Sequence, residues 1–163
     1  MILPSRLRRW VLGHLLRATA WRRSPDFIIG TIEDPYLLRW WLIPRNRFFN
    51  LYVHRFCRSD DDRALHDHPW ASVSVILDGG YIEHLSDNRQ MVRREGQITA
   101  RRASAAHRVQ LQDGTHAPDR VWTLFITGPR IRDWGFHCPR GWRRWQDFVA
   151  TTPGGNEVGR GCE

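Results

Sequence analysis

The stretch that decides the fold covers residues 65–80 and reads LHDHPWASVSVILDGG. His66 and His68 are two residues apart, so on an extended strand both imidazoles point to one face, about 6.5–7 Å apart along the chain. Asp67, between them, points to the other face. Two imidazoles placed in this way can hold one transition-metal ion. The apolar run 73–77 and two turn glycines follow, which predicts a buried strand that ends in a tight turn.

A second histidine segment lies further along the chain. It begins at Gly96 and ends at His107, which opens another apolar strand over residues 107–111. A His-x-His pair alone is a weak sign of a metal site, because such pairs are common on protein surfaces. Catalytic metal sites usually have three protein ligands and leave coordination positions open for water or substrate. His107 would supply the third ligand, so the three histidines together predict a metal centre.

The spacing of these residues resembles the two sequence motifs of the cupin superfamily. The first motif is a Gly, five residues, His-x-His, three or four residues, Glu, six residues and Gly. His66, His68 and Gly80 are in register with it. The second motif is a Gly, five residues, Pro-x-Gly, two residues, His, three residues and Asn. Gly96 and His107 are in register with that one.

The departures from these motifs change what the site can be. Asp60 stands at the first glycine, and Arg102, Ser104 and Leu111 replace the Pro, Gly and Asn of the second motif. Val73 stands at the position of the glutamate ligand, and a valine cannot bind metal. The sequence therefore resembles the cupins with three histidine ligands, such as the thiol dioxygenases and some diketone- and flavonol-cleaving dioxygenases.

This resemblance implies a divalent transition metal, with Fe(II) as the first choice and Zn, Ni, Mn or Cu as alternatives. Three neutral imidazoles leave the ion its full charge, which favours an anionic or chelating substrate. The implied function is a metal-binding cupin, an Fe(II) dioxygenase that acts on a small anionic molecule. A non-catalytic cupin that binds a small ligand and a metal-assisted isomerase are the alternatives.

Five further residues are candidates for the site. Glu83 is the candidate carboxylate, as a ligand or a base, and Tyr81 shares its strand face; their alternatives are an exposed glutamate and a core tyrosine. Arg63 could bind a substrate carboxylate through its guanidinium fork, and a solvated surface arginine is the alternative. His54 points into the barrel or away from it, and strand alternation leaves both open. Trp70 is expected to line or pack the barrel.

Short extended segments follow one another from Phe27 onward, separated by turn signals. The predicted strands cover residues 27–32, 50–57, 72–77, 81–85, 90–94, 97–100, 107–111 and 121–127, and residues 141–148 are either a last strand or a short helix. This pattern predicts a mainly β chain, a single cupin-type jelly-roll barrel over residues 27–150. Residues 1–26 are expected to form a basic amphipathic helix, and residues 151–163 a flexible tail.

The N-terminal helix is predicted over residues 5–22, and Ser24-Pro25 ends it. Apolar and aromatic side chains recur at three- and four-residue spacing, at Leu7, Trp10, Val11, His14, Leu15, Ala18 and Trp21. This row is expected to pack against the barrel. The alternative is contact with an anionic surface such as a membrane. No base-reading or stacking pattern indicates specific nucleic-acid recognition.

The net charge of +8 is concentrated at the N-terminus. Residues 1–24 hold six arginines and no acid, which leaves 19 arginines against 17 acids in the rest of the chain. All basic residues are arginines, so a lysine Schiff base, a pyridoxal-binding lysine and a Walker lysine are excluded.

Cysteine usage and hydropathy bear on the location of the chain. Cys57, Cys138 and Cys162 are odd in number and far apart, which argues against a disulfide framework and favours a reducing cytosol. No apolar run is long enough to span a bilayer, and the arginines within residues 3–21 do not fit a signal peptide. We therefore expect a cytoplasmic protein. As partners, we expect a small-molecule substrate or ligand and a second copy of the chain in a homodimer.

Overall fold

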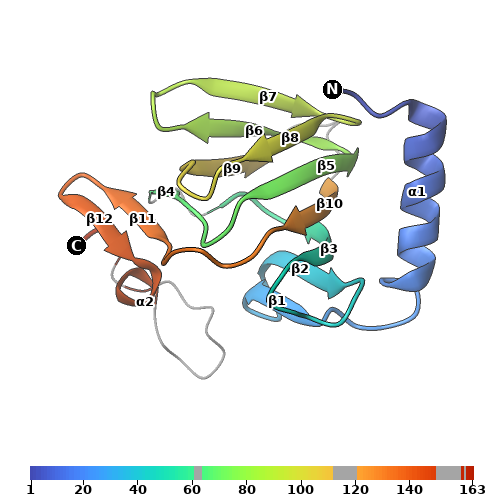
Figure 1. Cartoon of the computed structure of the whole chain (residues 1–163), viewed down its shortest axis with the longest axis horizontal. Helices are drawn as coiled ribbons and strands as arrows, with labels where there is room; N and C mark the ends of the chain where they lie inside the picture. The colour runs from blue at the N-terminus through green and yellow to red at the C-terminus, as the bar shows by residue number, and fades with distance from the viewer. Residues whose placement is uncertain (61–63, 112–120, 150–158, 160) are drawn as a thin grey trace.

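A computed structural model shows two antiparallel sheets packed face to face, with one long helix on the outside (Figure 1). It describes residues 1–60, 64–111, 121–149, 159 and 161–163. Arg63 and most of the predicted tail lie outside the described residues. The elements are α1 (Ser5–Ala18), β1 (Phe27–Gly30), β2 (Pro35–Trp41), β3 (Asn50–Phe56), β4 (Leu65–His66), β5 (Ser72–Asp78), β6 (Gly80–Leu85), β7 (Gln90–Arg94), β8 (Ile98–Arg101), β9 (His107–Leu111), β10 (Val121–Thr127), β11 (Gly135–Cys138), β12 (Gly141–Arg144) and α2 (Trp145–Phe148).

The order of the strands is that of a jelly roll. One sheet has the order β1-β2-β3-β10-β5-β8 and the other has the order β12-β11-β4-β9-β6-β7. Strands far apart in sequence are neighbours, as where β10 lies between β3 and β5, and every pairing is antiparallel. Chain crossings between two facing sheets in this way define the jelly-roll class. The predicted mainly β jelly roll is therefore confirmed.

The bounds of several elements differ from the prediction. The sequence pattern missed β2, because Asp34-Pro35 is a turn signal, whereas proline is tolerated as the first residue of a strand. Residues 141–148 contain both proposed elements, since β12 is followed directly by α2. Helix α1 ends at Ala18 instead of residue 22.

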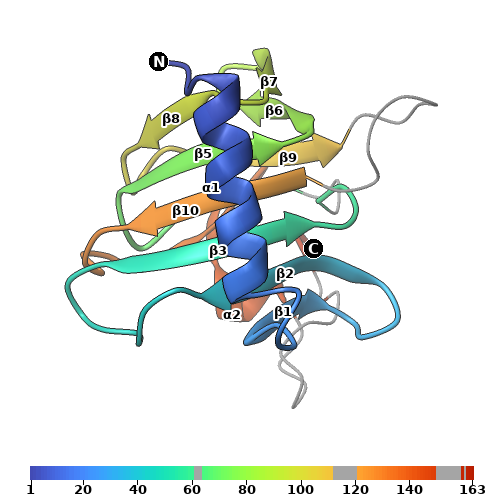
Figure 2. The same ribbon diagram turned by 90° about the vertical axis from the view of Figure 1, so that its right-hand side faces the viewer.

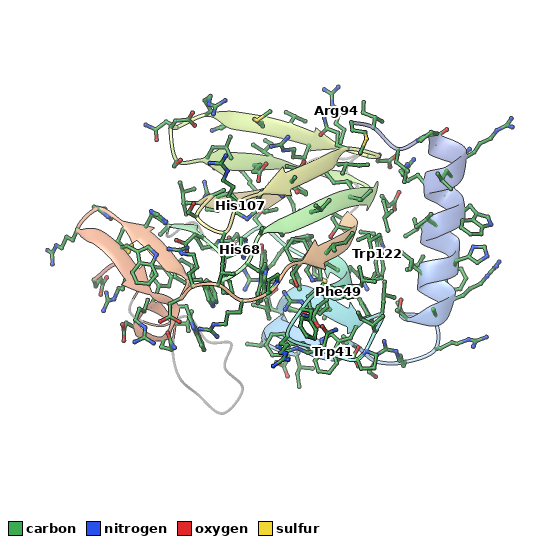
Figure 3. The ribbon with its side chains drawn as sticks, viewed as in Figure 1. Trp41, Phe49, His68, Arg94, His107 and Trp122 are labelled. Atoms are coloured by element: carbon green, nitrogen blue, oxygen red, sulfur yellow. A yellow bond between two sulfur atoms is a disulfide. The ribbon has the colours of Figure 1, made fainter. Side chains whose placement is uncertain are left out.

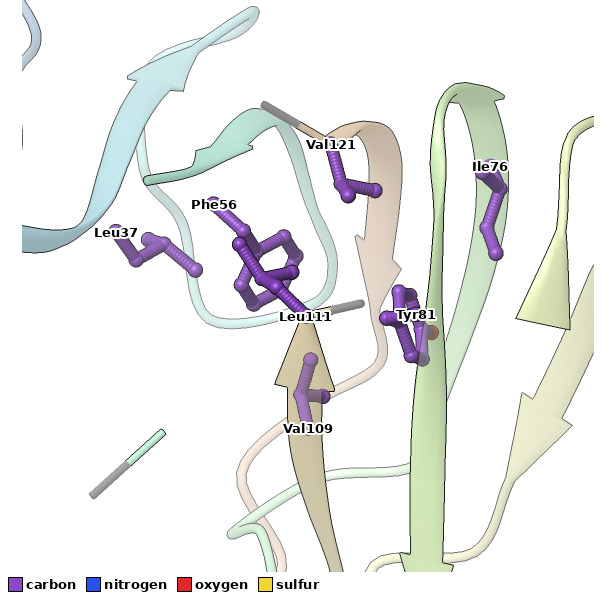
Figure 4. Packing of buried hydrophobic residues seen from close by; sticks show 7 residues of the cluster. All are labelled: Leu37, Phe56, Ile76, Tyr81, Val109, Leu111 and Val121. Carbon is purple, nitrogen blue, oxygen red and sulfur yellow. The ribbon is translucent and has the colours of Figure 1, made fainter. Parts of the chain in front are cut away.

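The apolar part of the barrel interior takes side chains from both sheets (Figure 4). It consists of Leu37, Phe56, Ile76, Tyr81, Val109, Leu111 and Val121. The Phe56 ring packs 6.0 Å from the Tyr81 ring, centroid to centroid, and so joins β3 of one sheet to β6 of the other. Full burial of each large apolar side chain stabilises the fold by about 1.5–3 kcal/mol.

Two motif glycines lie where the backbone approaches closely. Gly96 has φ +80°, and a Cβ there would lie 2.8 Å from the Leu3 carbonyl oxygen. The Leu3 amide donates to the Gly96 carbonyl at 2.7 Å, so the N-terminal residues dock on this turn. At Gly80 a Cβ would lie 2.6 Å from the Arg93 carbonyl oxygen on β7. Any side chain at either position would displace the backbone.

Helix α1 lies across the outer face of the first sheet (Figure 2), but only part of the predicted row packs on it. Arg8 is buried and donates to the Leu77 carbonyl and to Glu95, whereas Trp10 and Trp21 are 60% and 64% exposed. The helix packs on the barrel as predicted, but the predicted facing is wrong for its tryptophans, while Val11 and Leu15 of the same row are half-buried. The sheet offers α1 a carbonyl and a carboxylate together, and the guanidinium of Arg8 has enough N–H groups to donate to both, whereas an indole has one. No helix within the described ranges has both the length and the hydropathy needed to cross a membrane.

The structure contains a disulfide between Cys138 and Cys162, whose Cα atoms are 5.4 Å apart. The expectation that the cysteines form no disulfide is therefore wrong. They are 24 residues apart without a local motif, so only the path of the chain brings them together. The Gly161 amide also donates to the Phe148 carbonyl at 3.0 Å, which ties the last residues to α2. Because disulfides persist in oxidising environments, the cysteine count no longer supports a reducing cytosol.

Candidate metal centre

Three imidazoles meet between the sheets, where β4 pairs with β9. His66 is paired in register with His107, and His68 follows two residues later. The ring centroids lie 5.1 Å (His66–His107), 5.2 Å (His66–His68) and 5.2 Å (His68–His107) apart. Figure 3 shows His68 and His107 side by side. The predicted triad is thus brought together as a nearly equilateral triangle.

The donor atoms of this triad fit a metal ion. One nitrogen from each ring lies within 4.8 Å of the others, and Nε2 of His68 is 2.9 Å from Nε2 of His107. Imidazole nitrogens bind first-row metals at about 2.0–2.1 Å, so two such ligands at right angles lie roughly 3 Å apart. Of the side chains in the described ranges, this group alone has such an arrangement.

Carboxylates lie behind two of the three rings. Nδ1 of His107 is 2.8 Å from Oε1 of Glu83, and Nδ1 of His66 is 3.2 Å from Oδ2 of Asp60. These are close charge contacts, since Nδ1 of His107 and Oδ2 of Asp60 have no hydrogen-bond partner among the described residues. A carboxylate beside Nδ1 favours the tautomer with its proton there, which leaves the Nε2 lone pair for the cluster. Asp60, which departs from the glycine of the first motif, therefore supplies a carboxylate to the site.

Glu83 is fully buried, and both of its oxygens are engaged. Oε2 accepts from Nε of Arg93 at 2.6 Å, and Oε1 accepts from Nε of Arg101 at 2.7 Å in addition to its contact with His107. Burial acts to raise the pKa of Glu83, but His107, Arg101 and Arg93 outweigh it and lower that pKa to about 2. Glu83 is thus an ionised carboxylate behind His107, outside the cluster of candidate ligand atoms.

Asp67 points away from the triad, as alternation along the strand predicts. Only 1% of it is exposed. Its carboxylate accepts from the Gly135 amide at 2.9 Å and from Nε1 of Trp142 at 3.0 Å. It also lies 2.8 Å from the Arg132 guanidinium and 3.2 Å from Nε2 of His137. Asp67 therefore ties β11 and β12 to the segment that carries His66 and His68.

His54 points into the barrel, the facing that strand alternation left open. It is 3% exposed, and its ring stacks on Phe125 with centroids 4.9 Å apart. Nε2 of His54 accepts from Nε of Arg39 at 2.8 Å. Phe125 in turn lies 6.3 Å from His68, so His54 is one ring removed from the triad.

The other candidates lie in different surroundings. Tyr81 belongs to the apolar core, where burial raises the pKa of its hydroxyl. Trp70 is half-buried, and its Nε1 has no hydrogen-bond partner among the described residues. Val73 faces away from the barrel interior. Ile76 on the same strand faces inward, and residues an odd number of positions apart on a strand point to opposite faces. The neighbour Ser72 carries no carboxylate either, and Asp78 at the far end of β5 is not part of the clustered donor atoms.

Three arginines near the site were missed by sequence reasoning, namely Arg39, Arg93 and Arg101. Arg93 and Arg101 pair with Glu83, and Arg39 pairs with His54. In a chain with 25 arginines, residue type alone does not distinguish these from surface arginines. Their inward facing on β2, β7 and β8 became visible only once the sheets were paired.

The buried histidines predict an acid-sensitive fold for the metal-free protein. Burial lowers the pKa of His107 to about 4 and that of His68 well below its usual value. The unfolded chain therefore binds protons that the folded chain does not as pH falls below about 6.5. We expect the free energy of unfolding to drop by about 1.4 kcal/mol per pH unit for each such histidine. Urea unfolding at pH 7, 6 and 5 measures this slope, and a flat profile would contradict it.

No protein-family profile and no curated protein matches the sequence. Solved structures do match. The chain aligns with the DMSP lyase DddQ of Ruegeria pomeroyi at 13% identity and a TM-score of 0.52, over 74% of this chain and 61% of the lyase. It aligns with a provisionally assigned mannose-6-phosphate isomerase of Ralstonia eutropha at 17% identity and a TM-score of 0.50, over 64% and 92% of the two chains. A cupin superfamily protein of Desulfitobacterium hafniense aligns at 15% identity and a TM-score of 0.45, over 57% and 77%.

At these identities the likeness shows the fold alone, because unrelated chemistries share one fold. The chain therefore has the double-stranded β-helix fold of the cupins, with a histidine triad that could hold a metal.

Proposed function

We propose that this protein is a metal-dependent cupin enzyme, in which His66, His68 and His107 bind one divalent transition metal. The observation that carries the proposal is the convergence of three imidazole nitrogens within 4.8 Å, with carboxylates behind two of the rings. Fe(II) is the metal we propose first, with Zn, Ni, Mn and Cu as the alternatives.

The chain's own residues prepare the triad for such an ion. Glu83 and Asp60 place carboxylates beside Nδ1 of His107 and His66, which favours the ring proton at Nδ1. Burial keeps His68 and His107 neutral at pH 7, and a neutral imidazole is the form that binds metal. When bound, the metal supplies Lewis-acid or redox chemistry at its open positions.

Aromatic rings lie beside two histidines of the triad. Trp134 and Phe136 lie 6.5 Å and 5.9 Å from His66, and Phe125 lies 6.3 Å from His68. A low-dielectric wall strengthens every charge interaction beside it. Three neutral ligands and the nearby arginines favour a small anionic substrate, and oxidation by O2 is the reaction we propose.

Metal analysis tests the proposal. The protein is loaded anaerobically with Fe(II), desalted and measured by elemental analysis. We expect one iron per chain, and a loss of affinity of more than about 100-fold in His66→Ala, His68→Ala and His107→Ala. The matched control is His84→Ala, since His84 lies on β6, bonds to Gln110 at 2.7 Å and is outside the triad. Equal metal content in the wild type and in the folded triad variants would refute the site.

Oxygen uptake tests the proposed reaction separately. The iron-loaded protein is screened with small carboxylates and thiols for O2 consumption that the His107→Ala variant lacks. Metal binding without O2 consumption would contradict the dioxygenase and favour an isomerase or a binding cupin. Size-exclusion chromatography with light scattering tests the proposed homodimer.

A second function is favoured by the outward face of α1, which we propose binds an anionic lipid surface. Leu7 and Trp10 on α1, and Trp21 just after its end, are 47%, 60% and 64% exposed. Residues 1–24 carry six arginines and no acid, and five of these arginines remain for the surface because Arg8 is buried. Exposed tryptophan beside arginine in one segment suits the headgroup region, because the indole enters the interface while the guanidinium pairs with phosphate.

Vesicle co-sedimentation tests this second proposal. We expect binding to vesicles with about 30% phosphatidylserine, about tenfold weaker binding by Trp10→Gln/Trp21→Gln, and release by salt. Phe48→Gln is the control, because Phe48 is 63% exposed and lies outside α1. Equal binding by the double variant, or binding to nucleic acid in place of vesicles, would contradict a lipid partner.

A further inference from the structure

Arg39 lies on the inward face of the first sheet, beside His54. Its Nε donates to Nε2 of His54 at 2.8 Å, and its guanidinium carbon lies 4.9 Å from the centre of the Tyr52 ring. A second ring, Phe27, lies 5.8 Å from the same carbon. Arg39 thus has aromatic rings and a neutral imidazole around its charge.

The charge of Arg39 has no carboxylate partner among the described residues. Two other inward-facing arginines have one, since Arg93 and Arg101 share Glu83. A guanidinium withdrawn from water without a counter-charge costs free energy. Burial lowers the pKa of Arg39 to about 10, so it nevertheless stays charged at neutral pH.

The free edge of Arg39 suits a carboxylate. Nε is occupied by His54, while the part of the chain that the structure describes offers no acceptor to the two Nη groups. Two parallel N–H groups of a guanidinium match the two oxygens of a carboxylate, which gives a directed, charge-assisted pair. The Arg39 guanidinium thus keeps both a positive charge and N–H donors that an anion would satisfy.

Arg39 is close to the histidine triad through two ring contacts. His54, which holds Arg39, stacks on Phe125 at 4.9 Å, and Phe125 lies 6.3 Å from His68. Burial lowers the pKa of His68 most, and the charge of Arg39 also lowers it, which places the two on the same side of the first sheet.

We propose that Arg39 binds a carboxylate group of the substrate, with His54 orienting its guanidinium. The substrate is then a small carboxylate whose second polar group faces the triad. This deepens the proposed metal-dependent function and rests on it for that second group, whereas carboxylate binding at Arg39 itself does not need the metal.

Calorimetric titration with dicarboxylates tests the inference. Malonate, succinate and glutarate are titrated into the metal-free and the anaerobic Fe(II)-loaded protein, with the neutral succinamide as the ligand control. We expect at least one dicarboxylate to bind, at least tenfold weaker binding by Arg39→Gln, and partial recovery in Arg39→Lys. Succinamide should not discriminate among the variants.

Arg55→Gln is the matched control, because Arg55 lies on β3 beside His54 but faces Trp122 on the other side of the sheet. It should bind the dicarboxylate like the wild type. The melting temperature of ligand-free Arg39→Gln should not fall, since the substitution removes an uncompensated charge. A marked fall would indicate a structural role and contradict the proposal.

The outcomes separate the two proposals. Iron binding without any Arg39-dependent dicarboxylate binding overturns the carboxylate site and leaves the metal centre standing. Arg39-dependent binding in a protein that takes up no metal supports the carboxylate site and refutes the metal-dependent function. An equal loss in Arg55→Gln would show that the effect is one of general charge, and would overturn the assignment to Arg39.

Discussion

Glu83→Ala is expected to lower the free energy of unfolding at pH 7 by about 3–5 kcal/mol, because it leaves two buried guanidinium groups without their carboxylate. The side chains of Arg93 and Arg101 are only 14% and 7% exposed, so water does not replace the lost partner. The lowered pKa of Glu83 also means that its ionised form stabilises the fold. The carboxylate contributes stability fully above about pH 4.5, and that contribution is lost as pH falls towards 2.

The same substitution should weaken metal binding. Without Glu83 the His107 ring loses the carboxylate beside Nδ1, and loss of such a partner costs about 10–100-fold in metal affinity. Urea unfolding and competition with a chelator measure the two effects. Glu83→Gln keeps the size and part of the hydrogen bonding, so its loss of stability should be smaller.

The control for Glu83 is Glu33→Ala, since Glu33 is exposed on the loop before β2. Its free energy of unfolding should change by less than about 0.5 kcal/mol. An equally small change in Glu83→Ala would mean that Arg93 and Arg101 find other partners, and that Glu83 does not hold the barrel interior together.

Asp67→Ala is expected to cost about 1–3 kcal/mol, through the other side of the triad. The Gly135 amide is buried, whereas the side chains of Arg132 and Trp142 are partly exposed, so water replaces part of the lost contacts. The substitution leaves the buried Gly135 amide and the Trp142 indole without their acceptor. It also removes the counter-charge of Arg132. Because Asp67 joins β4 to β11 and β12, we expect His66 and His68 to lose their fixed geometry and metal affinity to fall with stability.

Asp133→Asn is the matched control for Asp67. Asp133 is 48% exposed and pairs with Arg130 on the surface, so its loss should change stability by less than about 1 kcal/mol. Asp67→Asn should lie between the two, because the amide retains one acceptor oxygen. A loss of stability in Asp67→Ala no larger than in the control would show that the carboxylate is not the link between these strands.

Strand alternation and turn chemistry carried most of the fold prediction. The predicted bounds of β7, β9 and β10 agree with the structure, because polar turns on both sides leave one place for each strand. The same reasoning missed β2, in which aromatic and apolar residues follow a proline without an alternating pattern. It also misjudged which side of α1 packs on the barrel. Several rows of apolar residues on that helix have helical spacing, and only contact with the sheet decides which row is buried.

The pair His66 and His68 indicates both the fold and the position of the candidate site. By itself the sequence determined a jelly roll with these two residues and His107 as its candidate ligands, since spacing of two along a strand and glycines at tight turns are local properties. It did not determine what stands behind those ligands. That Glu83 holds His107, that Arg39 keeps an unpaired charge, and that Cys138 meets Cys162 are properties of pairs distant in the chain. Only the pairing of the two sheets decided them, because charge compensation and burial depend on which neighbours folding brings together.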